Sequence, residues 1–250
     1  MGKYKKIITI TGIFVAILAL TGCLNNSSPE EKIYDTLEEV AALEEDFQKQ
    51  QEPLQKLEEE DNELYGKIIQ LGMKEIEEIQ SLSNDAIKGI EERQALMKKE
   101  KAAIDKAKEQ FEDFDDHIND LEDSSLKTKA NELKETMTSR YNEYDELYKQ
   151  YTKSLTQENE LYKLFKKEDV TKEDLQKQIE VINETYNSLM NSNKKFNDLT
   201  NEYNEQKIAF YKSGKLDVDT EWEKAIRSDG FFLEVQGYYL NNLIRFGMFC

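Results

Sequence analysis

The sequence has little of what disulfide frameworks, metal sites and phosphate-binding surfaces require. Its 250 residues include two Cys, one His and 34 Lys or Arg against 52 Asp or Glu, which gives a formal net charge of −18. Two cysteines exclude a disulfide framework and a cysteine-rich metal site. One histidine excludes a zinc site with several histidine ligands. The deficit of basic residues excludes a nucleic-acid binder that grips phosphates with a basic surface.

Residues that break helices are scarce as well. The chain has two prolines, and the 124 residues from 90 to 213 contain neither proline nor glycine. So long a stretch without a strong breaker favours helix over strand. The sequence also has no glycine-rich phosphate loop and no Gly-x-Ser-x-Gly motif, so it offers neither a nucleotide-binding loop nor a hydrolase nucleophile elbow.

The N-terminus has the pattern of a secretory signal peptide. Three lysines within the first six residues precede an uncharged apolar run over residues 7–20. That run has 14 residues, whereas a helix needs about 20 to span the hydrocarbon core of a bilayer. A basic start followed by a short apolar segment is typical of an exported protein.

A cysteine follows this segment directly. The four residues at the junction resemble the lipobox of bacterial lipoproteins: Leu20, Thr21, Gly22 and Cys23. In that class the cysteine is acylated, with chains such as palmitate, and the signal peptide is cut just before it. The resemblance predicts a signal peptide over 1–22, lipidation of Cys23, a tether over 23–28 and a lipid-anchored location on the extracellular face of the cell membrane. An ordinary signal peptide with a chance cysteine is the alternative.

Apolar residues recur at helical spacing through the rest of the chain. Stripes of this kind run over residues 33–71, 104–121 and 133–165. They cannot stay exposed in water and must pack on one another. The clearest stripe repeats every seven residues: Leu175, Ile182, Leu189, Phe196, Tyr203 and Phe210.

Capping signals mark where helices begin. Ser28, followed by Pro29 and by Glu31, predicts one helix start. Thr171, with an acid three residues on, predicts another. Further breaks are predicted as a loop over 122–125, capped by Ser124 or Ser125, a bend over 82–85, and a kink rather than an end at Pro53.

These signals define the fold class. Short loops make neighbouring helices antiparallel, and a helix of about 40 residues is roughly 60 Å long. The sequence therefore predicts an all-α fold, an elongated antiparallel helical bundle or coiled coil of three to four long helices, over residues 29–213. We expect no deep pocket in such a shape. Whether residues 29–81 form one kinked helix or two stays open.

Several segments together resemble one lipoprotein family. They are the lipobox, 28–34, 43–47, 50–54, 71–75, 140–144 and 202–207. With this series, roughly residues 1–219 resemble the YkyA family, cell-wall-binding lipoproteins of Gram-positive bacteria. The resemblance implies a cell-envelope location and wall binding, and it supplies no catalytic residue.

The C-terminal segment has a different composition. Residues 228–250 contain 13 apolar and three charged residues out of 23. We therefore predict an atypical aromatic-rich tail over 214–250. Three interpretations stay open: a disordered tail outside the reading frame usual for the family, an aromatic segment at a membrane interface or on a partner, and a segment packed on one end of the bundle.

Chemistry-bearing residues have structural explanations. His117 lies beside apolar stripe positions and is predicted to face solvent. Carboxylate runs such as 58–61 and 113–116 are predicted to be solvated helix faces. They could bind divalent cations weakly, but they lack EF-hand spacing. A glycosidase pair would need two carboxylates facing each other across a cleft. We predict no catalytic residue, no specific metal site and no cofactor.

One aromatic stripe is a candidate binding surface. Tyrosine is favoured in interfaces, and aromatic rings stack on sugars. The alternative is that these rings fill a bundle core and that their hydroxyls reach water. The members are Tyr141, Tyr144, Tyr148, Tyr151 and Tyr162.

Two function hypotheses remain. The first is a lipid-anchored, non-enzymatic cell-envelope protein that binds the cell wall or acts as a spacer or scaffold between membrane and wall. The second is a coiled-coil adaptor that binds a membrane or cell-division protein without touching the wall. At a net charge of −21 for the chain without residues 1–22, direct wall contact would have to involve peptidoglycan glycan or peptide stems, or be bridged by divalent cations.

Overall fold

The computed structural model describes residues 27–71 and 75–216. The predicted signal peptide, Cys23 and most of the predicted tail lie outside these residues. Five helices follow one another: α1 (Pro29–Ile68), α2 (Ile76–Phe111), α3 (Phe114–Asp120), α4 (Ser124–Phe165) and α5 (Lys172–Ser213).

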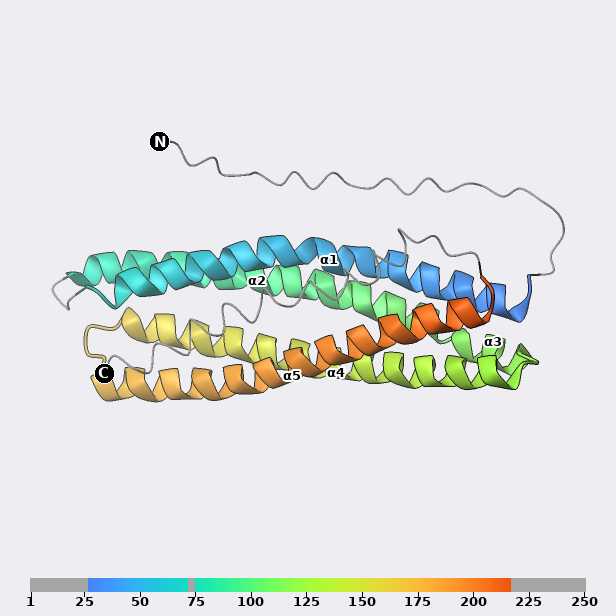
Figure 1. The fold of residues 1–250 in the computed structure, drawn as a ribbon. Helices are drawn as coiled ribbons and strands as arrows, with labels where there is room; N and C mark the ends of the chain where they lie inside the picture. The colour runs from blue at the N-terminus through green and yellow to red at the C-terminus, as the bar shows by residue number, and fades with distance from the viewer. Residues whose placement is uncertain (1–26, 72–74, 217–250) are drawn as a thin grey trace, which may run out of the picture.

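The helices form two long antiparallel hairpins. α1 pairs with α2, α4 pairs with α5, and the short helix α3 joins the hairpins at one end of the molecule (Figure 1). The hairpins meet mainly through α2 and α4. α5 lies obliquely, so that its C-terminal half reaches the N-terminal half of α1 (Figure 1), where the rings of Tyr34 and Tyr211 are 4.9 Å apart. The predicted all-α, elongated bundle with up to four long helices is confirmed.

Two of the predicted helix starts are present in full. Ser28 caps α1 in a reciprocal capping box with Glu31, with Pro29 in the first turn. Thr171 caps α5 in the same way with Asp174. Each box satisfies two otherwise free groups at the helix end. α1 also continues through Pro53 to Ile68, as the interpretation of that proline required.

Two local predictions are wrong, and one helix break was not predicted. The bend predicted at 82–85 lies inside the continuous helix α2, and the first hairpin turns after Ile68 instead. The stripe over 104–121 is buried as expected, but the backbone breaks between Phe111 and Phe114, where no glycine or proline marks it. α4 is capped by Asp123, which accepts hydrogen bonds from the backbone N–H groups of Ser125 and Leu126, and not by either serine.

The core runs along the length of the bundle. Five of the six members of the seven-residue repeat in α5 are buried, from Ile182 to Phe210. Leu175, the first member, packs against the core from a partly buried position. Aromatic rings cross between hairpins, as where Phe47 lies edge-on to Tyr144 at 5.8 Å between centroids. The apolar stripes read from the sequence therefore form one continuous core.

Candidate functional site

A cluster of buried charged groups lies where the two hairpins meet. Arg93 of α2 pairs with Glu158 of α4, and its guanidinium lies 3.7 Å from Asp61 of α1. Glu58 of α1 and Glu100 of α2 extend the cluster along the bundle. All five side chains are at least nine-tenths buried. Four carboxyl groups and one guanidinium thus lie inside the core, and the guanidinium contacts two of the four, Glu158 and Asp61.

Tyrosine hydroxyls satisfy these carboxyl groups. Each of the four donates one hydrogen bond to a different acid: Tyr144 to Glu100 at 2.9 Å, Tyr151 to Glu58 at 2.6 Å, Tyr162 to Asp61 at 2.9 Å and Tyr186 to Glu158 at 2.6 Å. Glu100 also accepts a bond of 2.8 Å from the Gln51 amide of α1. Because buried polar groups need partners, these bonds fix how the helices meet.

Burial changes the acidity of the cluster. Loss of hydration raises the pKa of Glu100 to about 8, and Tyr144 and Gln51 only partly offset this effect. Loss of hydration raises the pKa of Glu58 to about 7 against the opposing charge of Arg93. Burial raises the pKa of Asp61 in the same way. Near neutral pH, part of the cluster therefore holds its protons.

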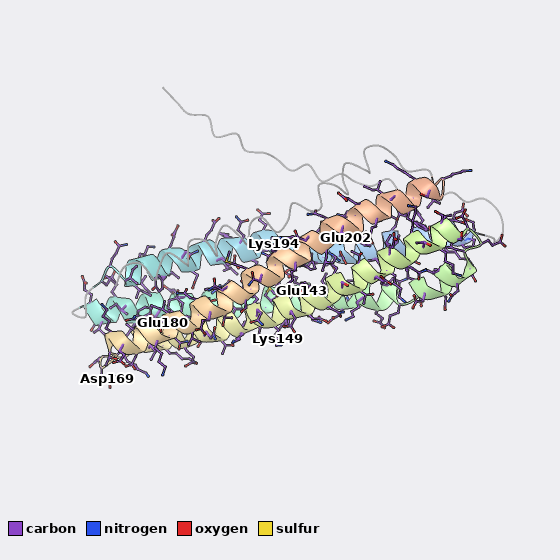
Figure 2. The ribbon with its side chains drawn as sticks, turned by 60° about the horizontal axis from the view of Figure 1, so that its bottom comes forward. Glu143, Lys149, Asp169, Glu180, Lys194 and Glu202 are labelled. Carbon is purple, nitrogen blue, oxygen red and sulfur yellow. The ribbon has the colours of Figure 1, made fainter. Side chains whose placement is uncertain are left out.

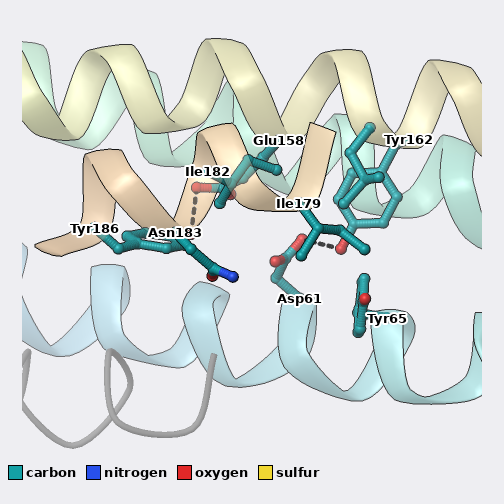
Figure 3. A pocket seen from close by; sticks show the side chains of 9 residues that line it. Asp61, Tyr65, Glu158, Tyr162, Ile179, Ile182, Asn183 and Tyr186 are labelled. Carbon is teal, nitrogen blue, oxygen red and sulfur yellow. Dashed lines mark hydrogen bonds between the residues drawn. The ribbon is translucent and has the colours of Figure 1, made fainter. Parts of the chain in front are cut away.

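A small cavity opens beside the cluster, between α1, α4 and α5. Asp61, Glu158, Tyr162 and Tyr186 line it, and the Asn183 side chain reaches into the same space (Figure 3). Its volume is about 20 Å³, which holds about one water molecule. A sugar ring cannot enter it, so these carboxyl groups do not flank a substrate cleft of the glycosidase kind in the closed bundle.

The half of the bundle nearer α3 is held by separate ion pairs. Arg140 of α4 forms a bidentate pair with Glu44 of α1 at 2.7 and 2.9 Å. Lys207 of α5 lies 2.9 Å from Glu38 of α1, and Tyr211 donates to the same carboxylate at 2.9 Å. The two-point pairing of the planar Arg140 guanidinium with Glu44 is strong and geometrically specific.

The tyrosine stripe lies largely inside the molecule. Tyr141, Tyr144, Tyr151 and Tyr162 are buried, and Tyr148 is half-buried. The hydroxyls of Tyr144, Tyr151 and Tyr162 reach carboxyl groups instead of the expected water. In the closed bundle a ligand could contact part of Tyr148, but it could reach the other four rings only if the hairpins separated. The stripe as a binding surface therefore stays a prediction.

The sequence interpretation also misplaced two acids. Glu59 and Glu60 are exposed, but Glu58 and Asp61 are buried, so the run 58–61 is not wholly a solvated face. The signal was available, because Leu54, Glu58, Asp61, Tyr65 and Ile68 keep the alternating spacing of a buried seam. Arg93 and Glu100 occupy such positions in α2.

Other candidate residues lie at the surface. Asp113, Asp115 and Asp116 are exposed and His117 is half-buried in α3. Over 27–71 and 75–216, no three His, Cys, Asp or Glu side chains are grouped to hold a metal ion. Within the same residues, no helix is both long and apolar enough to cross a bilayer.

Charge is unevenly distributed among the helices. α1 has 14 acidic and four basic residues, whereas α4 and α5 together have 14 acidic and 13 basic ones. On the outward surface of α4 and α5, here called the α4–α5 face, Lys149 and Lys194 lie among the acids Glu143, Glu180 and Glu202 (Figure 2). The acidic excess of the helices thus lies mostly in α1, and the α4–α5 hairpin is close to neutral.

Comparison with known proteins gives concordant results. Residues 28–213 match the model of the YkyA family, described as "Putative cell-wall binding lipoprotein". The chain is 32% identical to the uncharacterized lipoprotein YkyA of Bacillus subtilis (strain 168), over 80% of this chain and 90% of that protein. The fold is similar to the crystal structure of a conserved protein of unknown function from Staphylococcus aureus, with a TM-score of 0.59 and 20% identity over 75% of this chain and 97% of that one. By its sequence over the whole helical bundle, the chain belongs to the YkyA family of lipoproteins.

Proposed function

We propose that this protein is a non-enzymatic, lipid-anchored component of the cell envelope that contacts the cell wall through the α4–α5 face. The observation that carries the proposal is the separation of charge between α1 and the α4–α5 hairpin. Membership of a family described by wall binding supports the same assignment.

The topology suits a spacer that stands on the membrane. α1 begins at Pro29, which is six positions beyond Cys23 in the sequence. The start of α1, α3 and the end of α5 lie together at one end of the bundle (Figure 1). Acylation of Cys23 would place that end at the membrane. The 40 residues of α1 would then carry the other end roughly 60 Å outward.

The near-neutral face favours uncharged parts of the wall. Anionic wall polymers are repelled by α1, and this repulsion is screened beyond about 8 Å at physiological ionic strength. The α4–α5 face instead offers exposed amides and hydroxyls, among them Ser139, Asn142, Asn187 and Asn191. Such groups both donate and accept hydrogen bonds, which suits the amides and hydroxyls of glycan and peptide stems.

Two other functions receive less support. An adaptor that pairs with a partner helix needs an exposed apolar stripe. Within the described residues, the large apolar side chains that are clearly exposed are Ile69 (50%) and Val181 (37%). They lie on different helices and form no stripe. A hydrolase needs a cleft for its substrate, and the buried carboxyl groups lie beside a cavity the size of one water molecule.

Co-sedimentation with purified sacculi tests the proposal. The protein would be incubated with sacculi that carry or lack anionic polymer, with and without EDTA. We expect saturable pelleting that improves when the anionic polymer is removed. Loss of pelleting in EDTA would show that divalent cations bridge the charges. No pelleting under any of these conditions would contradict wall binding and favour a protein partner.

A matched pair of variants locates the contact. Asn187→Asp with Asn191→Asp adds two negative charges to the α4–α5 face, and Ala41→Glu with Ala42→Glu adds two to exposed positions of α1. We expect the first pair to weaken sacculus binding several-fold and the second to leave it within twofold. Equal effects of the two pairs would show that net charge, and not this face, governs binding.

A further inference from the structure

Most of the buried ionisable groups lie where the two hairpins meet. Three of the tyrosine–carboxyl bonds and the Arg93–Glu158 pair connect the α1–α2 hairpin with α4. Within each hairpin, by contrast, the helices pack along their lengths. A change of charge at Glu58 or Glu100 therefore affects the contacts with α4 across the interface, together with the contacts of these acids with Arg93 and Gln51 inside the α1–α2 hairpin.

The charge balance of this interface depends on its protons. With Glu58 and Glu100 protonated, the cluster retains Arg93 against Glu158 and Asp61. With every acid ionised, the buried cluster holds four carboxylates and one guanidinium, and that guanidinium is paired with Glu158. Like charges in a medium of low dielectric constant repel strongly, and unpaired buried charges are costly.

The two ends of the interface are held differently. Near α3 the hairpins are joined through the chain and by the Arg140–Glu44 and Lys207–Glu38 pairs. At the opposite end, the hydrogen bonds between α2 and the end of α4 are not ion pairs. Gln80 donates to the Lys166 carbonyl at 3.1 Å, and the Lys166 ammonium group donates to the Asn84 side chain at 2.6 Å. The hairpins can therefore separate most easily at the end away from α3.

From this arrangement we propose that the two hairpins form a proton-controlled clamp, hinged at α3, which is closed when Glu58 and Glu100 are protonated and opens at the opposite end when both are ionised. The inference does not depend on wall binding, because it rests on the interface alone. The raised pKa values of both groups place the transition near neutral to mildly alkaline pH.

The surroundings of Glu58 set the direction of the effect. From α2 it faces Arg93, whose positive charge favours ionisation. From α4 it faces the Tyr151 hydroxyl and Glu158, and from its own helix Asp61. Loss of hydration opposes ionisation most strongly, and the negative charges of Glu158 and Asp61 add smaller effects in the same direction.

Glu100 has no cation beside it. From α4 it faces the Tyr144 hydroxyl, and from α1 it faces the Gln51 amide and the acid Glu58. Tyrosine and glutamine bond the carboxyl group without neutralising it. When Glu100 loses its proton, its negative charge is therefore not balanced by a cation in its immediate surroundings.

Opening would expose the buried tyrosine stripe. Tyr144, Tyr151 and Tyr162 all donate to acids of the other hairpin. Separation at the end away from α3 would free these rings and their hydroxyls together. The clamp would thus control access to the aromatic surface that the closed bundle hides.

Pulsed electron spin resonance on the full chain in detergent tests the clamp. Cys23 and Cys250 are replaced by serine, and spin labels are attached at Lys88→Cys in α2 and Lys177→Cys in α5, both exposed and away from α3. From pH 6 to pH 9 we expect the label separation to lengthen by roughly 10 Å, about one helix diameter. Labels at Asp35→Cys and Asn131→Cys, near α3, should keep their separation.

Paired variants separate the clamp from general alkaline loosening. Glu58→Gln with Glu100→Gln should keep the pH 6 distance at pH 9, because the amides stay neutral. Glu63→Gln with Glu91→Gln, exposed on the same two helices, should open like the parent. Circular dichroism at pH 6 checks that each variant is folded.

The parent protein alone can overturn the inference. An unchanged Lys88–Lys177 label distance between pH 6 and pH 9 would do so without any variant. Equal lengthening of both label pairs would indicate unfolding and not hinged opening. Opening of the Glu58→Gln, Glu100→Gln protein at pH 9 would assign the effect to other groups.

Discussion

Replacing Glu100 by glutamine should make the bundle less sensitive to alkali. The pKa of this buried carboxyl group is raised from 4.5 to about 8, mainly by loss of hydration. A difference of one pKa unit between the folded and unfolded states corresponds to about 1.4 kcal/mol in the free energy of ionisation. Ionising Glu100 inside the folded bundle therefore costs about 5 kcal/mol relative to ionising it in the unfolded chain.

The direction in which stability changes with pH follows from the raised pKa of Glu100. Below pH 4.5 both states are protonated, and Glu100 does not change the free energy of unfolding. Between pH 4.5 and about pH 8 the folded state binds more protons than the unfolded state, so stability falls as pH rises. Above about pH 8 the destabilisation is complete.

Urea unfolding followed by circular dichroism measures the effect at pH 5, 7 and 9. At pH 9 we expect Glu100→Gln to be more stable than the parent by about 3 to 5 kcal/mol, and at pH 5 the two should agree within about 1 kcal/mol. Glu91→Gln, exposed on the same helix, is the control and should follow the parent. The reasoning is refuted if the parent gains stability from pH 5 to pH 9, or if Glu100→Gln keeps the parent's pH slope.

Three further changes have expected outcomes in thermal or urea unfolding. Arg93→Met should lower the free energy of unfolding by about 3 to 5 kcal/mol at pH 7, because Glu158 and Asp61 lose their buried cation. The loss should be smaller at pH 5, where Asp61 binds a proton more readily. No loss of stability at pH 7 would show that the ion pair is dispensable. Pro53→Ala should stabilise by about 1 to 3 kcal/mol, because a helix-interior proline removes a backbone bond, and a lower melting temperature would contradict this. Ser28→Ala should cost about 1 kcal/mol by removing the cap of α1, whereas Ser28→Asp, which can still cap, should be close to neutral.

The sequence predicts the architecture better than its interior chemistry. Apolar spacing and the caps at Ser28 and Thr171 are local signals, and both are present as expected. The turn between Phe111 and Phe114 is set by how α3 packs against α1 and α4. That packing is tertiary, so no breaker residue marks it.

The buried acids show a different limit. Glu58 and Glu100 occupy seam positions, but a carboxylate in such a run is usually read as exposed because burying a charge is costly. Their burial depends on partners far away in the chain, Tyr151 and Tyr144. The seam spacing alone could have flagged them, but only the fold shows the hydroxyls that make burial tolerable.

Because α1 is strongly acidic and the α4–α5 hairpin is close to neutral, the bundle has an asymmetric charge distribution across its long axis. Anchored at one end through Cys23, as we propose, the protein could turn about that axis. In a layer of fixed negative charge, the side that carries α1 would turn away from the densest charge. The uneven charge of the helices would thus set the rotation of the roughly 60 Å bundle about its long axis, and so determine which side faces the fixed charge.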